Sequence, residues 1–145
     1  MHTVLMAFLG SLGYGLLFNV KGRKLVFTGL SGAAGWLVYL LFYSISGSLI
    51  FSTFVGAMAV GFYSETAARL LKSPSTVFSI PGILPLVPGI TAYEMIQAVT
   101  ENDMANATVK MVNTIGAAGA KAFGILLVTA VFRRISKKKR RVRFE

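Results

Sequence analysis

The sequence predicts an all-α, polytopic membrane protein with about five transmembrane helices, the fourth of them broken by prolines. Of the 145 residues, 54% are hydrophobic and only 14% are charged, whereas soluble domains are nearer a quarter charged. The mean hydropathy is +0.68. The charges are crowded into a few places, and the stretches between them are almost uncharged. Such stretches suit lipid, where no water satisfies polar groups along a span.

Five apolar segments follow one another along the chain. They predict spans over about residues 3–18, 25–43, 49–71, 76–93 and 112–132, each near the roughly 20 residues that a helix needs to cross the hydrocarbon core. The first segment has no basic stretch before it, unlike a signal peptide, so we interpret it as a span. Residues 1–135 are thus expected to form a single transmembrane domain, with a basic cytoplasmic tail over 136–145.

The connections between these segments alternate in charge. Residues 21–24 carry three positive charges, 44–48 carry none, and 69–72 carry two. Residues 94–110 carry three acids and one lysine, whereas 133–145 carry eight basic residues. With five spans every basic connection falls on one face, and the positive-inside rule then predicts the N-terminus outside and the C-terminus inside. Four spans would put basic segments on both faces.

The acidic connection contains its own helix signal. Thr91 and Glu94 match a Thr-x-x-Glu capping box directly after Pro88 and Gly89, and in such a box the threonine hydroxyl accepts hydrogen bonds from the first free N–H groups. We therefore expect a short outward-side helix over about residues 91–103, followed by a turn and the last span.

The residue inventory argues against catalysis and metal binding. The chain has no cysteine, one histidine (His2) and five acidic residues. No nucleophile–base pair or metal-ligand cluster is visible, so we expect no catalytic residue, no metal and no cofactor. The net charge of +10 comes largely from the basic C-terminal tail. A tail after an apolar span indicates binding to anionic lipid and not to nucleic acid.

The fourth segment departs most from an ordinary helix. It contains Pro81, Pro85 and Pro88, with Gly82 and Gly89 beside them. Each proline lacks an N–H and clashes with the carbonyl four residues earlier, so the carbonyls of residues 77, 81 and 84 lose their helical partners. The segment is therefore predicted to be kinked or unwound at membrane depth, where only protein or a water-filled cavity can satisfy its backbone.

A broken helix of this kind has two interpretations. In transporters, half-helix N-termini face anionic groups and freed carbonyls bind cations or ammonium groups. A helix restarting at Thr91 would direct its positive end at the break and bind a carboxylate there, and Tyr93 is a further ligand candidate. Alternatively, the break only shapes the bundle, and Tyr93 belongs to an interfacial aromatic belt.

Three charged residues fall inside the spans. Lys121 lies near the middle of the fifth span, where a lysine is costly and by default a functional candidate. It could attract a carboxylate, or instead satisfy Glu65 or a backbone carbonyl. Glu65 and Arg69 are four residues apart and so share a helix face. They suggest a gate or proton site at the cytoplasmic mouth, or a simple interfacial ion pair.

Small residues recur in the second, third and fifth spans. Because helices in lipid associate through close backbone approach, they predict tight packing within the bundle, with subunit contact as the alternative. They are Gly29, Gly32, Gly35, Gly56, Gly61, Gly116, Gly119 and Gly124.

Several stretches together resemble the threonine/serine exporter family, in its small-protein branch. The specific one is residues 81–89, PGILPLVPG, with Ala68-Arg69, Pro74, Val77-Phe78 and Tyr93 around it. Residues 15–20, GLLFNV, followed by basic residues, are similar to the family's first span. Lys121 and Glu65 are not part of this resemblance.

The resemblance implies secondary export of small amino or carboxylic acids, such as threonine and serine, or succinate in a bacterial two-protein system. It also implies a larger family protein as partner and a place in the plasma membrane of a bacterium. Five short spans are few for alternating access in one chain, so a partner is expected; a homo-oligomer is the other possibility. A membrane scaffold without a substrate path and a small channel remain alternative functions. An intramembrane enzyme is the least expected.

Overall fold

The computed structural model describes residues 2–87 and 89–141, with side chains described as far as residue 135. Within those residues the fold is entirely helical. In chain order the elements are α1 (His2–Leu17), α2 (Arg23–Ser46), α3 (Leu49–Leu70), α4 (Thr76–Ile83), the 3-10 turn η1 (Leu84–Leu86), α5 (Gly89–Thr100) and α6 (Met104–Arg141). The predicted all-α class is confirmed.

Helix length and composition agree with a membrane protein. Among the described residues, α2, α3 and α6 are each long and apolar enough to cross a bilayer, and α4 with α5 makes a fourth candidate if the bent pair is one span. The helix α1 is apolar but has only 16 residues. The outside of the bundle carries many exposed large apolar side chains, as expected of surfaces that contact lipid or a protein partner.

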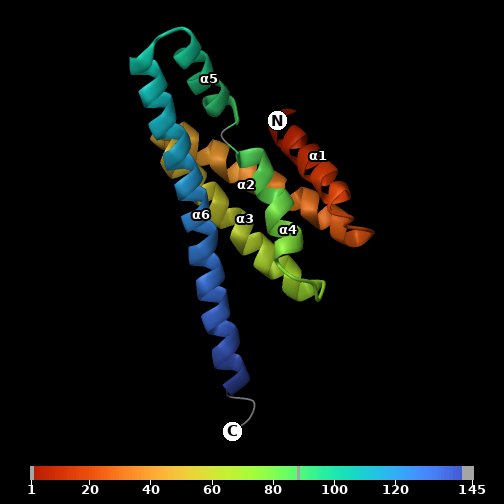
Figure 1. The fold of residues 1–145 in the computed structure, drawn as a ribbon. Coiled ribbons are helices and arrows are strands. Elements are labelled where there is room, and N and C mark those ends of the chain that lie inside the picture. The colour runs from red at the N-terminus through yellow and green to blue at the C-terminus, as the bar shows by residue number, and fades with distance from the viewer. Residues whose placement is uncertain (1, 88, 142–145) are drawn as a thin grey trace.

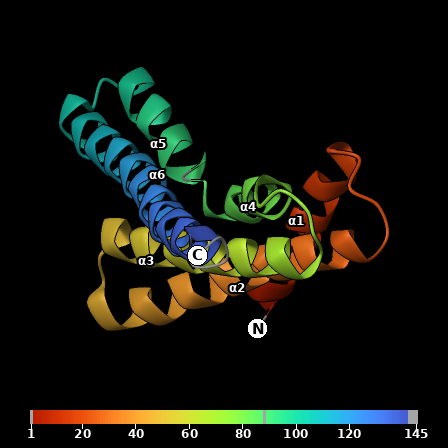
Figure 2. The same cartoon turned by 90° about the horizontal axis from the view of Figure 1, so that it is seen from below.

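The helices form a bundle from which a hairpin projects (Figure 1). Helix α2 packs against α1, α3 and α4, and α3 also packs against α6. Seen from below, α2 and α3 form one side of the bundle, and α4 and α6 lie across them (Figure 2). Among the described helices, α5 packs only against α6. The break between η1 and α5 therefore separates α4, which packs in the bundle, from α5, which packs only on α6.

Four of the described helices end near a residue in the left-handed backbone conformation. Asn19, Gly47, Lys72 and Asn102 all have positive φ near the end of a helix, which is the usual way to terminate one. At the start of α6, the Asp103 carboxylate accepts a hydrogen bond from the Asn106 backbone N–H at 3.1 Å. Asp103 thus caps α6, because its side chain satisfies one of the free N–H groups of the first turn.

Glycines allow the helices of the bundle to approach closely. A Cβ on Gly35 would lie 2.3 Å from a methyl group of Val60, and a Cβ on Gly124 would lie 2.9 Å from the Phe54 carbonyl oxygen. Tight packing within the bundle is therefore confirmed for the α2–α3 and α3–α6 contacts. Gly119, in contrast, faces open space, so the subunit-contact alternative stays open at that position.

The last helix is longer than the span predicted over residues 112–132. Helix α6 has 38 residues, or about 57 Å at about 1.5 Å per residue, whereas the hydrocarbon core is about 30 Å thick. It is long because Asp103 caps its start and no proline follows to interrupt it. Much of the predicted tail continues α6 as far as Arg141, and residues 142–145 lie outside the described part.

Candidate functional site

The predicted break in the fourth segment is confirmed. Helix α4 ends at Ile83, η1 covers Leu84–Leu86, and α5 begins at Gly89, with an angle of 43° between the two helical halves. Val87 is extended, with φ −65° and ψ 128°, a conformation that residues before proline favour, although Leu84 before Pro85 stays helical. The helix is interrupted at this extended residue. It begins again at Gly89 and not at Thr91, which lies in the first turn.

Side chains and local turns compensate for the N–H groups that the prolines lack. The Thr28 hydroxyl of α2 donates mainly to the Lys24 carbonyl of its own helix at 2.9 Å. It lies 3.4 Å from the Val77 carbonyl oxygen, the one that Pro81 cannot serve, and so gives it only a weak, shared hydrogen bond. The Leu84 carbonyl accepts from the Val87 N–H at 3.0 Å, as in a 3-10 turn. Of the three carbonyls predicted to lose their helical partners, Leu84 thus acquires a new one and Val77 a weak one.

Lys121 of α6 reaches the break directly. Its Nζ donates a hydrogen bond to the Leu86 carbonyl oxygen at 2.7 Å, and the residue is only 7% exposed. Of the partners considered from the sequence, a backbone carbonyl is therefore the one found. A charged donor makes a stronger hydrogen bond than a neutral one, so Lys121 ties α6 firmly to the last turn of η1.

Small hydroxyl residues surround the α4 half of the break. Ser31 of α2 and Ser64 of α3 are fully buried, and their hydroxyl oxygens lie 3.3 Å apart. A Cβ on Gly82 would approach the Ser31 hydroxyl oxygen to 2.4 Å. Gly82 and the buried Pro81 therefore seat α4 against a polar patch of the bundle.

A cavity of about 390 Å³ lies on the α1 side of the break, with Leu84 and Pro85 in its wall. Trp36 and Tyr14 also line it. Within the described part of the chain, the buried indole N–H of Trp36 has no hydrogen-bond partner, which is unusual for a buried donor. The second predicted path proline, Pro85, thus borders a cavity that contains a polar group.

The remaining predicted path residues belong to α5 or fall outside the described residues. Gly89 and Thr91 are in the first turn of α5, and Tyr93 is 68% exposed. Pro88 lies outside the described residues. Lys121 therefore reaches the end of η1, which contains Pro85 and follows Pro81 and Gly82 in the chain, whereas Tyr93 lies on the outer surface of α5.

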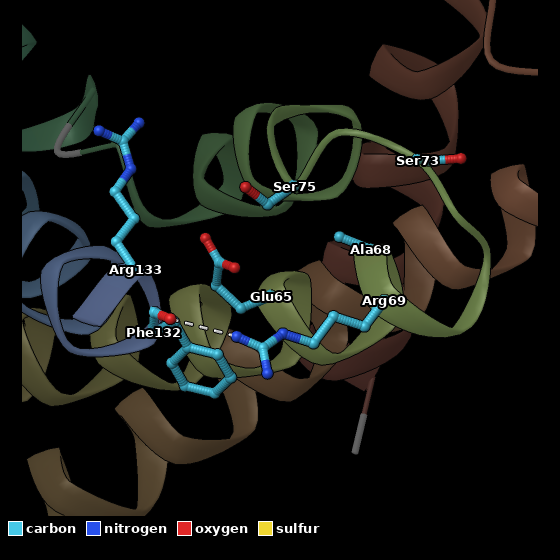
Figure 3. Close-up of a pocket in the computed structure, with 7 residues that line it drawn as sticks. All are labelled: Glu65, Ala68, Arg69, Ser73, Ser75, Phe132 and Arg133. Carbon is cyan, nitrogen blue, oxygen red and sulfur yellow. Dashed lines mark hydrogen bonds between the residues drawn. The ribbon is translucent and has the colours of Figure 1, made fainter. Parts of the chain in front are cut away.

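A second cavity, of about 420 Å³, lies where α3 ends, beside the start of α4 and a late turn of α6. We call it the inner pocket. Figure 3 shows the Glu65 carboxylate below Ser75, and the side chains of Arg69 and Arg133 at its edge. Ala68, Ser73 and Phe132 complete the lining. The predicted gate pair Glu65 and Arg69 is thus found in one pocket.

The two gate residues are not joined by an ion pair within the described residues, where the single ion pair is Lys110–Glu94. Arg69 instead donates from Nη2 to the Phe132 carbonyl at 3.3 Å, and its guanidinium carbon lies 4.7 Å from the centre of the Phe132 ring. This cation–π contact orients Arg69 along α6. The residues missed from the sequence are Trp36, Ser31, Ser64, Ser75 and Arg133; only the last carried a signal, as a charge at the end of a span.

Comparisons with known proteins give a matching family model and a set of relatives. The family model described as "Threonine/Serine exporter, ThrE" matches residues 3–131. An uncharacterized protein of Haemophilus influenzae is 26% identical over 94 residues, which are 65% of this chain and 32% of that protein. The chain thus corresponds to about a third of that relative. No solved structure matches.

Proposed function

This chain belongs to the threonine/serine exporter family, and from that premise we propose that it is the membrane subunit of a secondary exporter of small amino or carboxylic acids. The family is one of transporters, so a substrate path is expected in this chain. We place it at the break between α4 and α5, with Pro81, Gly82, Pro85, Pro88, Gly89, Thr91 and Tyr93 as path residues.

The observation that carries this proposal is the hydrogen bond from Lys121 to the Leu86 carbonyl. A buried lysine in an apolar helix is costly and is retained where it serves a path or a switch. At the break, the ammonium group of an amino acid could replace Lys121 on the carbonyl, and the carboxylate could pair with Lys121. Both exchanges use groups already present, so the lysine would move between two partners during transport.

We further propose a topology of five spans with the N-terminus outside and the C-terminus inside. The fifth span is α1, which adds to the three long helices and the bent pair. This arrangement places the basic residues 21–24 and 69–72 and the end of α6 on one face, in keeping with the positive-inside rule. The described helices then form one transmembrane domain over residues 1–135. The basic residues beyond it bind anionic lipid at the inner face of a bacterial plasma membrane.

A larger family protein is the proposed partner, either alone or together with a second copy of this chain. The relative from H. influenzae extends well beyond the part that matches, which supports a second half that accompanies this one. The exposed apolar surfaces of the bundle offer room for such a partner. The neighbouring reading frame is the simplest check, because a larger family member beside this gene would support a two-component exporter.

Two alternatives use the same fold. A scaffold without its own path would need the break only for shape, and a small channel would pass its substrate without coupling. Flux through a channel would not depend on the proton gradient and would show little saturation with substrate concentration. The buried Lys121 favours a binding exchange over an open channel, because its ammonium group blocks the carbonyl that a passing ion would use.

A complemented deletion strain tests the proposal. Intracellular and extracellular threonine, serine and succinate are compared in cells that lack the chain and in cells that carry it. The same comparison is made with Pro81, Pro85 and Pro88 all replaced by alanine, and the protein level is measured by immunoblot. We expect the proline variant to reach the membrane and to lose export. Unchanged export by that variant would rule out a path at the break.

A further inference from the structure

The inner pocket combines both signs of charge in one small space. Its volume of about 420 Å³ falls within the range of small-molecule sites, about 300–1,000 Å³. Glu65 supplies a carboxylate, and Arg69 and Arg133 supply two guanidinium groups. The carboxylate would repel a simple anion, and the two arginines would repel a simple cation.

The two arginines have different surroundings. Arg69 lies against Phe132 through both the ring and the backbone carbonyl, so its position follows α6. Arg133 is the next residue of α6 and lies at the edge of the pocket with an exposed side chain (Figure 3). Arg133 can therefore turn toward a ligand, whereas Arg69 forms part of the wall.

Glu65 is half-buried, and within the described residues no ion pair involves it. A carboxylate removed from water is expensive without a compensating charge. Its carboxylate points into the pocket from α3, below Ser75 (Figure 3). A positively charged ligand group would compensate it there.

We propose that the inner pocket is a loading site for the zwitterion of an α-amino acid, with Glu65 receiving the ammonium group and Arg133 the carboxylate. The proposal rests on the exporter function and gives it a substrate class. A dicarboxylate fits poorly, because its second carboxylate would meet Glu65 and like charges repel. The pocket thus admits amino acids and rejects dicarboxylates, whatever the break itself can bind.

Two substitutions separate the two charges of the ligand. Glu65→Gln removes the partner of the ammonium group, which only the amino acid has. Arg133→Gln removes the partner of a carboxylate, which both ligand classes have. Arg134→Gln is the matched control, since it makes the same charge change one residue along α6 but outside the pocket.

Binding is measured by calorimetry on the purified full chain in lipid nanodiscs, with L-threonine, L-serine and succinate as probes. We expect Glu65→Gln to weaken amino-acid binding about tenfold, equivalent to about 1.4 kcal/mol, and to leave succinate binding equal or stronger. Arg133→Gln should also weaken amino-acid binding, and any succinate binding by the wild type should stay unchanged, since the pocket rejects dicarboxylates. Arg134→Gln should change neither class.

Export by cells carrying the same variants gives the second readout. A wild-type chain that binds amino acids but exports nothing would overturn the exporter function and leave the pocket assigned. A wild-type chain that exports amino acids while Glu65→Gln keeps wild-type binding and selectivity would overturn the pocket alone. A wild-type chain that binds none of the three probes, or a Glu65→Gln variant that weakens both ligand classes equally, would also overturn it.

Discussion

Lys121 and Leu86 lie 35 residues apart in the sequence, yet the ammonium nitrogen of one is 2.7 Å from the carbonyl oxygen of the other. The contact joins the middle of α6 to the end of the 3-10 turn. It depends on the break, because Leu86 is followed by an extended residue and its carbonyl does not continue a helical ladder. The lysine and the prolines are therefore parts of one arrangement.

Replacing Lys121 by methionine should lower export about tenfold while the protein level falls less. The substrate carboxylate would lose its proposed cationic partner, and a loss of about 1.4 kcal/mol of binding is a factor of ten. Lys121→Arg keeps a charged donor and should retain part of the export. Lys110→Met is the control on the same helix, since Lys110 pairs with Glu94 and does not contact the break. Equal loss of export and protein level in Lys121→Met would indicate a purely structural lysine.

Replacing Gly82 by alanine should destabilise the bundle by about 1–3 kcal/mol, the usual cost of overpacking. The added Cβ would lie 2.4 Å from the Ser31 hydroxyl oxygen and 3.0 Å from its Cβ, so α4 would have to move away from α2. Thermal unfolding in detergent measures the loss. Gly119→Ala provides the comparison, because Gly119 is also helical but faces open space. If both variants melt together, the close α2–α4 contact does not contribute to stability.

The start of α6 should loosen in acid. Hydrogen bonds from the Asn106 backbone N–H, and then from its side chain, lower the pKa of Asp103. The ionised carboxylate is thus favoured in the folded state, and its stabilisation is complete above the unfolded pKa of about 3.9. The stabilisation is lost as the pH falls through the lower folded pKa.

Hydrogen exchange of the first turn of α6, followed from about pH 5 to about pH 2, measures this loss. The Asp103→Asn variant keeps a capping oxygen but cannot ionise, so its relative protection should not depend on pH in this window. A wild-type profile parallel to that of Asp103→Asn would show that the carboxylate charge is unimportant for the cap.

Cysteine labelling tests the proposed topology without background, because the chain has no cysteine of its own. Single cysteines at Ser46 and Glu101 should react with an impermeant reagent added outside intact cells. A cysteine at Lys21 should react only after the cells are opened, and a tag at the C-terminus should report the cytoplasm. Any one of these on the opposite face would exclude five spans with the N-terminus outside.

The helices themselves could be predicted well from the sequence. The apolar segments over residues 25–43 and 49–71 correspond to α2 and α3, and the three prolines indicated the break. These features are local, since they depend on apolar length and on the missing proline N–H. The prediction differed from the structure at residues 89 and 104, where helices begin earlier than expected. The conformation of Val87 and the Asp103 cap determine these two starts.

The candidate site was less predictable, because its contacts join distant parts of the chain. The spacing of Glu65 and Arg69 placed them on one helix face, but Arg69 contacts Phe132, which is 63 residues away. Likewise, the sequence identified Lys121 as a charge inside a span, but it did not show which carbonyl oxygen the lysine would contact. Spacing along one helix predicts which residues share a face and not which other helix covers it.

The continuity of α6 has a mechanical consequence. Lys121 at the break and Phe132 at the inner pocket lie on the same uninterrupted helix, eleven positions and about 16 Å apart at about 1.5 Å per residue. A rigid rod transmits a rotation along its length, so a turn of α6 that withdraws Lys121 from Leu86 also shifts the pocket wall at Phe132 and Arg133. Occupancy of either place would then change the affinity of the other by the same factor, since coupling between two binding equilibria is reciprocal. Binding at the inner pocket and passage at the break would thereby be coupled through one helix.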